Sequence, residues 1–148
     1  MSDLAVAADP VALANRLRPA LLRLNRELRR EGSTLGISGG QATLLHLISR
    51  SPGAGVRELA AREGMSAAGM SGHVDRLEAA GLLRRVRSTD DRRRVGLEVT
   101  EAGHRILRAV RRRRTAWLAQ RLGRLSPDEL EALDAALAPL ERLLEVDA

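Results

Sequence analysis

Leucines recur at helical spacing near the start of the chain. Asp9 and Pro10 precede them and are favoured at the N-cap and first position of a helix, and Gly32 is expected to end it. The leucines of this stripe are Leu13, Leu17, Leu21, Leu24 and Leu28. A stripe that is continuous over about four turns must be buried. The stripe could pack equally well on the core of its own chain or on a helix of a second subunit.

Shorter helices are predicted in the next part of the chain. The first begins at Ser38, in a capping box, and ends at Ser51. Residues 56–63 form the second, which Gly64 ends as a left-handed cap, and residues 66–81 hold the third. Two helices joined by a tight turn with glycine are typical of a helix-turn-helix, whose second helix lies in a major groove of DNA. Alone this motif is a weak signal.

A hairpin follows the helix-turn-helix pattern. Residues 82–87 and 95–100 have the composition of strands, and residues 88–91 have turn chemistry. The tip carries Arg92, Arg93 and Arg94. A cationic hairpin tip, or wing, beside a helix that reads a major groove suits the neighbouring minor groove.

Two helices are predicted after the hairpin. Thr100 caps the first, which continues to Leu125. Residues 126–129 combine a capping box with proline at the first helical position and begin the second. Its leucine stripe consists of Leu130, Leu133, Leu137, Leu140 and Leu144. Pro139 lies inside this stripe and should kink or end the helix, and the stripe again requires a partner.

Composition removes several classes of function. The 148 residues include no Cys, Phe or Tyr, all 25 basic residues are Arg, and Trp117 is the sole aromatic residue. Disulfides, thiol nucleophiles and cysteine zinc sites are excluded, and so are RNA-binding modules that stack bases on aromatic rings. The N-terminus carries acids where a signal peptide has bases, and no apolar run approaches the length of a membrane span. We therefore expect a soluble, cytoplasmic protein.

The net charge of +6 divides unevenly along the chain. Residues 125–148 hold one Arg and seven acids, a charge of −6, so residues 1–124 carry 24 Arg and 12 acids, a charge of +12. The arginines concentrate in residues 84–94 and 105–114. Fields of this kind attract polyanions, although each run is equally well explained as a solvated surface.

Three segments resemble the MarR family of winged-helix regulators. They are VDRLEAAGL at 74–82, DRR at 91–93 and LEVTEAG at 97–103, with the spacing of the family pattern between them. The resemblance extends over nearly the whole chain. It implies a homodimeric repressor or activator that binds double-stranded DNA without a cofactor.

The implied fold is mainly α-helical. A winged helix-turn-helix region with a two-stranded β-wing is expected at 35–100. A helical dimerisation domain is expected from the N-terminal helix at 1–34 and the C-terminal helices at 101–148, so that the whole forms one intertwined domain. Interleaving of these helices with those of the partner would explain both leucine stripes.

Candidate DNA contacts follow from the motif. The resemblance implies that Arg93 enters the minor groove and that Asp91 helps to fix the wing. Gly72 stands where the family most often has a long polar residue, and His73 replaces a usual aliphatic residue, so we expect more shape readout and phosphate contact. The full set of expected contacts is Arg57, Ser66, Ala67, Ala68, Met70, Ser71, Arg76, Asp91, Arg92, Arg93 and Arg94. Arg76 has an alternative role, in pairing with Asp75 or Glu78.

The resemblance also implies a small-molecule effector pocket between the winged domain and the dimerising helices, for an anionic or aromatic ligand. Its candidate residues are Arg111, Trp117 and His46. The run of four arginines at 111–114 points round the whole helix, so part of it must face inward. Intersubunit salt bridges or a solvated face remain alternatives for the run, and a core position remains one for Trp117. The three histidines lack the spacing of a ligand pair, so no metal is expected.

The leading hypothesis is therefore a sequence-specific transcriptional regulator. It is expected to be a ligand-responsive repressor that places two recognition helices on a pseudo-palindrome, about 10 base pairs apart. A constitutive or architectural DNA-binding protein without an effector is the first alternative, and an interaction scaffold whose acidic C-terminal helix docks a basic partner is the second. No nucleophile elbow, glycine-rich phosphate loop or paired-carboxylate motif points to an enzyme.

Overall fold

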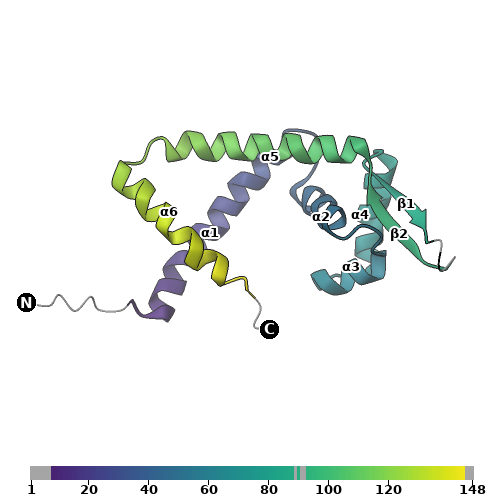
Figure 1. The fold of residues 1–148 in the computed structure, drawn as a ribbon, viewed down its shortest axis with the longest axis horizontal. Helices are drawn as coiled ribbons and strands as arrows, with labels where there is room; N and C mark the ends of the chain where they lie inside the picture. Colours follow the sequence, from purple (N-terminus) through teal and green to yellow (C-terminus); the bar gives the residue numbers. More distant parts are fainter. Residues whose placement is uncertain (1–7, 89, 91–92, 146–148) are drawn as a thin grey trace, which may run out of the picture. The chain divides into compact units, whose positions relative to one another are not determined.

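The computed structural model describes residues 8–88, 90 and 93–145, in two compact units that divide between Arg114 and Thr115. The elements of the first unit are α1 (Pro10–Ser33), α2 (Gly39–Arg50), α3 (Val56–Glu63), α4 (Ala67–Ala79), β1 (Leu83–Arg87), β2 (Val95–Val99) and the first part of α5 (Glu101–Leu122) (Figure 1). The second unit holds the rest of α5 and α6 (Pro127–Arg142). The mainly helical fold with a two-stranded antiparallel wing confirms the predicted class.

Local capping chemistry sets most helix ends, as the sequence predicted. The Gln41 amide donates to Ser38 Oγ over 3.1 Å, and the Ser38 amide donates to Gln41 Oε1 over 3.0 Å. Gly64 ends α3 in the left-handed region with φ of 63°, where a residue without Cβ is unstrained. The Gly69 amide donates to the Ser66 hydroxyl over 3.1 Å at the start of α4. These caps separate the two helices of the helix-turn-helix.

The structure excludes one of the two outcomes predicted for Pro139. This residue lies inside α6, which continues to Arg142, so Pro139 does not end the helix. Proline removes the amide hydrogen that would bond to the carbonyl of Ala135, and Ala135 is exposed, so water can solvate that carbonyl. Pro19 is likewise accommodated inside α1, whose side chains are mostly exposed.

The core of the first unit is built from the winged helix-turn-helix elements. Its fully buried large side chains are Leu45, Ile48, Leu59, Met70, Val74, Leu77, Leu83 and Leu97. Helix α5 adds Val110, with Ile106 and Leu107 packed at the edge of the cluster. The core therefore holds α2, α3, α4 and the wing together before any other contact is considered.

The wing is fixed to the rest of the unit by close backbone contacts. The Leu97 amide donates to Ala54 O over 3.0 Å, and the Gly53 amide donates to Leu97 O over 3.1 Å, so the loop before α3 lies along β2. A Cβ on Gly96 would collide with the backbone of Gly53. Thr100 Oγ1 donates to Gly81 O over 2.6 Å and accepts from the Gly103 amide, which joins the end of α4 to the start of α5.

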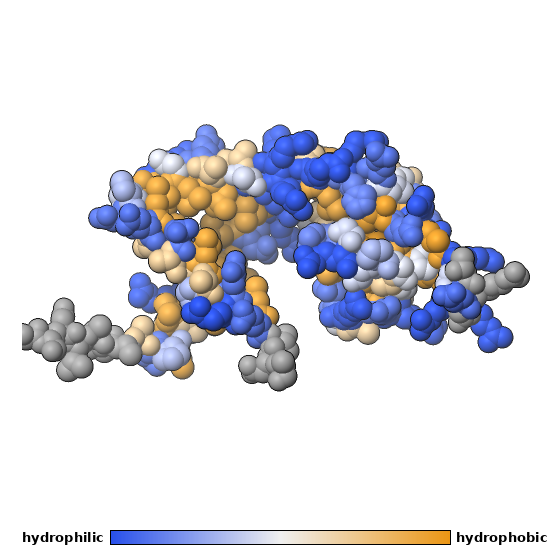
Figure 2. All heavy atoms as spheres, in the orientation of Figure 1, coloured by the Kyte–Doolittle hydropathy of each residue, from blue (hydrophilic) through white to orange (hydrophobic). Residues whose placement is uncertain are grey.

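The leucine stripes at the two ends of the chain are not buried in the single chain. No residue of α6 is buried, and in α1 only Gly32 is. Leu133 is 48% exposed and Leu137 is 54% exposed. Figure 2 shows apolar surface over α6. Both stripes are therefore available to a partner.

Candidate nucleic-acid interface

Helix α4 presents small side chains at its exposed start. Met70, Val74 and Leu77 face the core, at the i, i+4, i+7 spacing of a buried helix face. Ser66, Ala67 and Ala68 are exposed. The backbone at this end of the helix is therefore accessible to a close neighbour.

One expected contact is corrected by burial. Met70 is 1% exposed and belongs to the core cluster, so its side chain cannot reach a base edge. Ser71 and Gly72, which follow it, are half-buried. The part of α4 that is exposed enough to contact another molecule thus consists of its first turn and the face that carries Arg76.

Arg85 on β1 connects the wing to α4. Its Nη2 lies 2.7 Å from Asp75 Oδ1, and its Nη1 forms a short contact with Glu78 Oε1. The hydrogen bond to Asp75 raises the pKa of Arg85 above its ordinary value, which keeps the guanidinium charged. One cation therefore compensates two carboxylates on the recognition helix and holds the strand beside it. No local sequence pattern marks this role of Arg85.

The Arg85 contacts bear on the alternative predicted for Arg76, its pairing with Asp75 or Glu78. Both of its acidic neighbours, Asp75 and Glu78, are engaged by Arg85. Among the residues that the structure describes, Arg76 has no ion pair or hydrogen-bond partner. Its exposed guanidinium is therefore available to an anion.

The hairpin of the wing is stabilised along its length. Arg84 and Glu98 face each other across the strands, with Arg84 Nη2 2.9 Å from Glu98 Oε2. The Ser88 amide donates to Arg94 O over 3.0 Å, close to the tip. Arg93 and Arg94 are exposed. The predicted contacts Asp91 and Arg92 lie outside the described residues.

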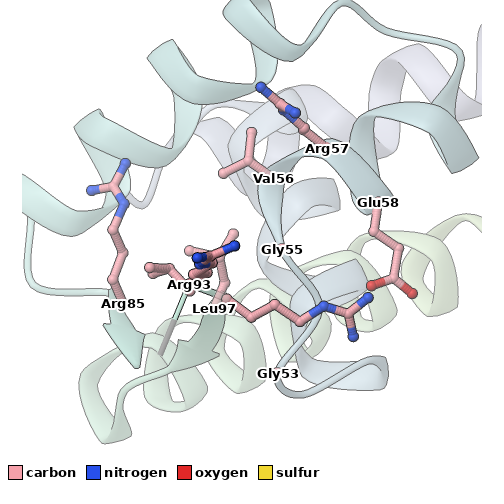
Figure 3. Close-up of a pocket in the computed structure, with 10 residues that line it drawn as sticks. Gly53, Gly55, Val56, Arg57, Glu58, Arg85, Arg93 and Leu97 are labelled. Carbon is pink, nitrogen blue, oxygen red and sulfur yellow. The ribbon is translucent and has the colours of Figure 1, made fainter. Parts of the chain in front are cut away.

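A basic cavity of about 730 Å³ lies between the wing and the start of α3 (Figure 3). Its lining consists of Gly53, Gly55, Val56, Arg57, Glu58, Arg85, Arg93, Arg94, Val95 and Leu97. Figure 3 shows Arg57, Arg85 and Arg93 on different sides of it. Four arginines and one acid give the lining a charge of +3. Guanidinium groups around an open cavity suit a chain of phosphates.

A second cavity, of about 220 Å³, lies behind α4. It is lined by Arg29, Gly40, Thr43, Leu44, Leu47, Glu63, Met65, Met70 and His73. His73 Nδ1 is buried and has no hydrogen-bond partner among the residues that the structure describes. A buried polar atom without a partner is costly, so a ligand group that bonded to it would be stabilised.

The arginine run of α5 divides between α1 and solvent. Arg114 Nε donates to Leu28 O over 3.0 Å, and desolvation lowers the pKa of Arg114. Arg113 Nε lies 3.6 Å from Glu31 Oε2. Arg111 and Arg112 are exposed. Part of the run faces inward, as the helical period required.

The three candidate effector residues lie on two helices, His46 on α2 and the other two on α5. His46 is exposed on α2, and Arg111 is exposed on α5. Trp117 is half-buried in the second unit, where the guanidinium carbon of Arg121 lies 3.9 Å from the centre of its ring. Their role in a pocket stays a prediction. Among the described residues no group of three His, Asp or Glu side chains could hold a metal, and no helix is suited to cross a membrane.

We predict that Arg85→Gln lowers the affinity for duplex DNA roughly tenfold, which corresponds to about 1.4 kcal/mol. The two carboxylates of α4 would then repel phosphates, and the wing would lose its tie to the helix. Fluorescence anisotropy with a labelled duplex measures the effect. Arg84→Gln on the same strand is the control, since its exposed pair with Glu98 contributes little. Equal affinities for the two variants would contradict the role of Arg85.

Comparison with known proteins gives a consistent result. The MarR family model matches residues 35–94. The chain is 33% identical to the HTH-type transcriptional regulator YfiV of Bacillus subtilis over 115 residues, 78% of this chain and 72% of the relative. It is 32% identical to the HTH-type transcriptional regulator MT0903.1 of Mycobacterium tuberculosis over 124 residues, 84% of this chain and 87% of the relative.

Solved structures agree with these relatives. A transcriptional regulator protein from Pseudomonas aeruginosa superposes with a TM-score of 0.80 at 30% identity, over 93% of this chain and 96% of that chain. MepR of S. aureus bound to an oligodeoxyribonucleotide has the same fold, with a TM-score of 0.68 at 18% identity, over 90% of this chain and 98% of that chain. The chain thus belongs to the MarR family of DNA-binding transcriptional regulators, which are not enzymes.

Proposed function

We propose that this protein is a homodimeric repressor that binds a pseudo-palindromic DNA site and responds to a small ligand. The observation that carries the proposal is the Arg85 tie. It holds the wing and α4 together, so that the exposed start of α4, Arg76 and the arginine-lined cavity belong to one basic surface. That MepR was crystallised with an oligodeoxyribonucleotide on the same fold supports a DNA partner.

The proposed contacts divide into two kinds. Ser66, Ala67, Ala68 and Ser71 would approach the major groove, and their small size favours readout of groove shape with few bidentate base contacts. The remaining contacts are basic or belong to the wing: Arg57, Arg76, Asp91, Arg92, Arg93 and Arg94. The arginines would neutralise phosphates or enter the minor groove, and Asp91 would help to fix the wing, as the family resemblance implies.

The dimer is proposed from the exposed leucines of α1 and α6. Leu133 and Leu137 of α6 are exposed, Leu144 just beyond its end is 83% exposed, and Leu13, Leu21 and Leu24 of α1 are also exposed. Contiguous apolar surface of this kind is rare on a soluble monomer and marks an interface. A second copy of the chain would cover these leucines with its own leucine stripes, and a two-fold axis would pair the stripes of the two copies. Two α4 helices would then face successive major grooves.

The first test is a binding selection from genomic fragments at physiological salt. We expect recovery of one inverted repeat whose half-sites lie about one helical turn apart. Arg93→Ala should weaken binding to that repeat, and an unchanged affinity would remove the wing assignment. Recovery of unrelated fragments would instead identify an architectural protein, and no recovery would contradict a regulator that binds DNA in its free state.

The dimer has its own test. The double variant Leu133→Glu with Leu137→Glu places two charges in the exposed stripe of α6 and should sediment as a monomer at concentrations where the wild type is a dimer. Operator affinity should fall together with dimerisation. Glu131→Gln on the same helix is the matched control and should remain dimeric. A dimer that persists in the double variant would show that α6 is not its interface.

A ligand response is proposed at the cavity behind α4. Arg29 gives one cationic side, Leu44 and Leu47 give apolar walls, and His73 Nδ1 offers an unused polar atom on the recognition helix itself. This lining suits a small carboxylate with an apolar body. A ligand there would contact α4 directly, so its affinity would differ between α4 positions, as a shift of conformational populations requires.

We expect a panel of small carboxylates that includes benzoate to contain compounds that raise the melting temperature and weaken operator binding. His73→Leu should abolish both effects, since it removes the unused nitrogen. His46→Leu on exposed α2 is the control. If His46→Leu abolished the response and His73→Leu did not, the site would lie at the pocket first predicted around His46. If no compound acted, the ligand response would be contradicted.

A further inference from the structure

The first part of α5 carries a second basic surface. It consists of Arg105, Arg108, Arg111 and Arg112, which we call the α5 stripe. All four side chains are exposed, and none has an ion pair or hydrogen bond to another described residue. At about 100° per residue they fall within an arc of about 120° on the helix. The stripe is therefore one continuous cationic face.

The α5 stripe points away from the core. The opposite arc of the helix contains Ile106, Leu107 and Val110, which pack on the core cluster. In Figure 1 the first part of α5 lies along one edge of this unit and α3, which bears Arg57, lies at the opposite edge. Figure 2 shows hydrophilic surface along the outer side of α5. One DNA duplex on the α4 surface would therefore leave the stripe free.

Four arginines without an ion pair lie together on the stripe, whereas several other arginines of the unit are paired. Arg62, Arg84, Arg85 and Arg113 each have a carboxylate within 4 Å. The stripe has only Glu101 on its arc, one turn before Arg105, so its charge is +3 from four arginines and one acid. Unpaired guanidinium groups of one sign attract a polyanion.

The chemistry of the stripe favours duplex DNA as that polyanion. Apart from the arginines and Glu101 its arc holds the exposed His104, and it has no apolar residue and no Phe, Tyr or Trp, whereas protein interfaces have an apolar core with aromatic anchors. Single-stranded nucleic acids are bound by stacking on successive aromatic rings, and the arc offers a single imidazole, that of His104. From Arg105 to Arg112 the stripe is about 10.5 Å long, and a duplex presents roughly six phosphate charges over that length.

We propose that the α5 stripe binds a second DNA duplex, without sequence preference, while α4 and the wing hold the operator. The protein would then join two DNA segments. This inference rests on the proposed function for the operator surface, but the stripe itself needs only phosphates. Its affinity should fall steeply with salt, because each phosphate contact releases counterions.

The test saturates the protein with unlabelled operator duplex and adds a labelled duplex of unrelated sequence at low salt. The wild type should bind the second duplex. The variant Arg105→Gln, Arg108→Gln and Arg112→Gln should bind it at least tenfold more weakly, with operator affinity within about twofold. A control with the same loss of charge at scattered sites, Arg16→Gln, Arg124→Gln and Arg142→Gln, should behave as the wild type.

The remaining outcomes separate the two proposals. If the wild type binds the operator but not the second duplex, the stripe proposal is overturned and the regulator proposal stands. The same conclusion follows if the control variant loses binding of the second duplex as fully as the stripe variant. If the genomic selection yields no operator, the labelled duplex is added alone to Arg57→Ala with Arg93→Ala. If this variant binds the labelled duplex and loses that binding when the stripe arginines are also changed to Gln, the stripe proposal is supported although the regulator proposal has failed. If the stripe variant instead dissolves an assembly larger than a dimer, the stripe binds another copy of the chain and the proposal is wrong.

Discussion

The contact of Arg85 with Asp75 and Glu78 is the constraint on which the proposed DNA surface depends. Without it the recognition helix would carry two uncompensated carboxylates where phosphates are expected. The wing has only two strands, which are marginal alone, so its position depends on contacts with its neighbours. The loop at Gly53 and Ala54 fixes one side of the hairpin, and Arg85 fixes it to α4. Shape and charge of the surface are therefore set by the same residue.

Features with local causes could be predicted from the sequence. The capping box at Ser38 and the left-handed Gly64 require only neighbouring residues, and both are found where predicted. Arg85 could not be assigned because its partners lie on another element, 10 and 7 positions before it. The burial of Met70, in contrast, follows from a local pattern, since Met70, Val74 and Leu77 have the i, i+4, i+7 spacing of one buried helix face.

Consecutive arginines on α5 have different environments because the helix turns them by about 100° at each step. Arg114 reaches the Leu28 carbonyl near the end of α1, where the negative end of the helix dipole favours a cation despite partial burial. Arg111 and Arg112 are left on the solvent side. Counting arginines thus identifies a basic protein, but only helical phase and the position of acids separate structural cations from those that can bind an anion.

The exposed leucines connect stability to the spacing of the DNA surfaces. The first unit has a core within the winged helix-turn-helix, whereas α6 has no buried residue and α1 buries only a glycine. In the proposed dimer, association would supply the burial of these helices and would set the distance between two copies of α4. The cavity that contains Arg29 of α1 and His73 of α4 links the two regions. A ligand in this cavity, whose volume is about 220 Å³, would contact both α4, the proposed DNA-reading helix, and α1, which belongs to the proposed dimer interface.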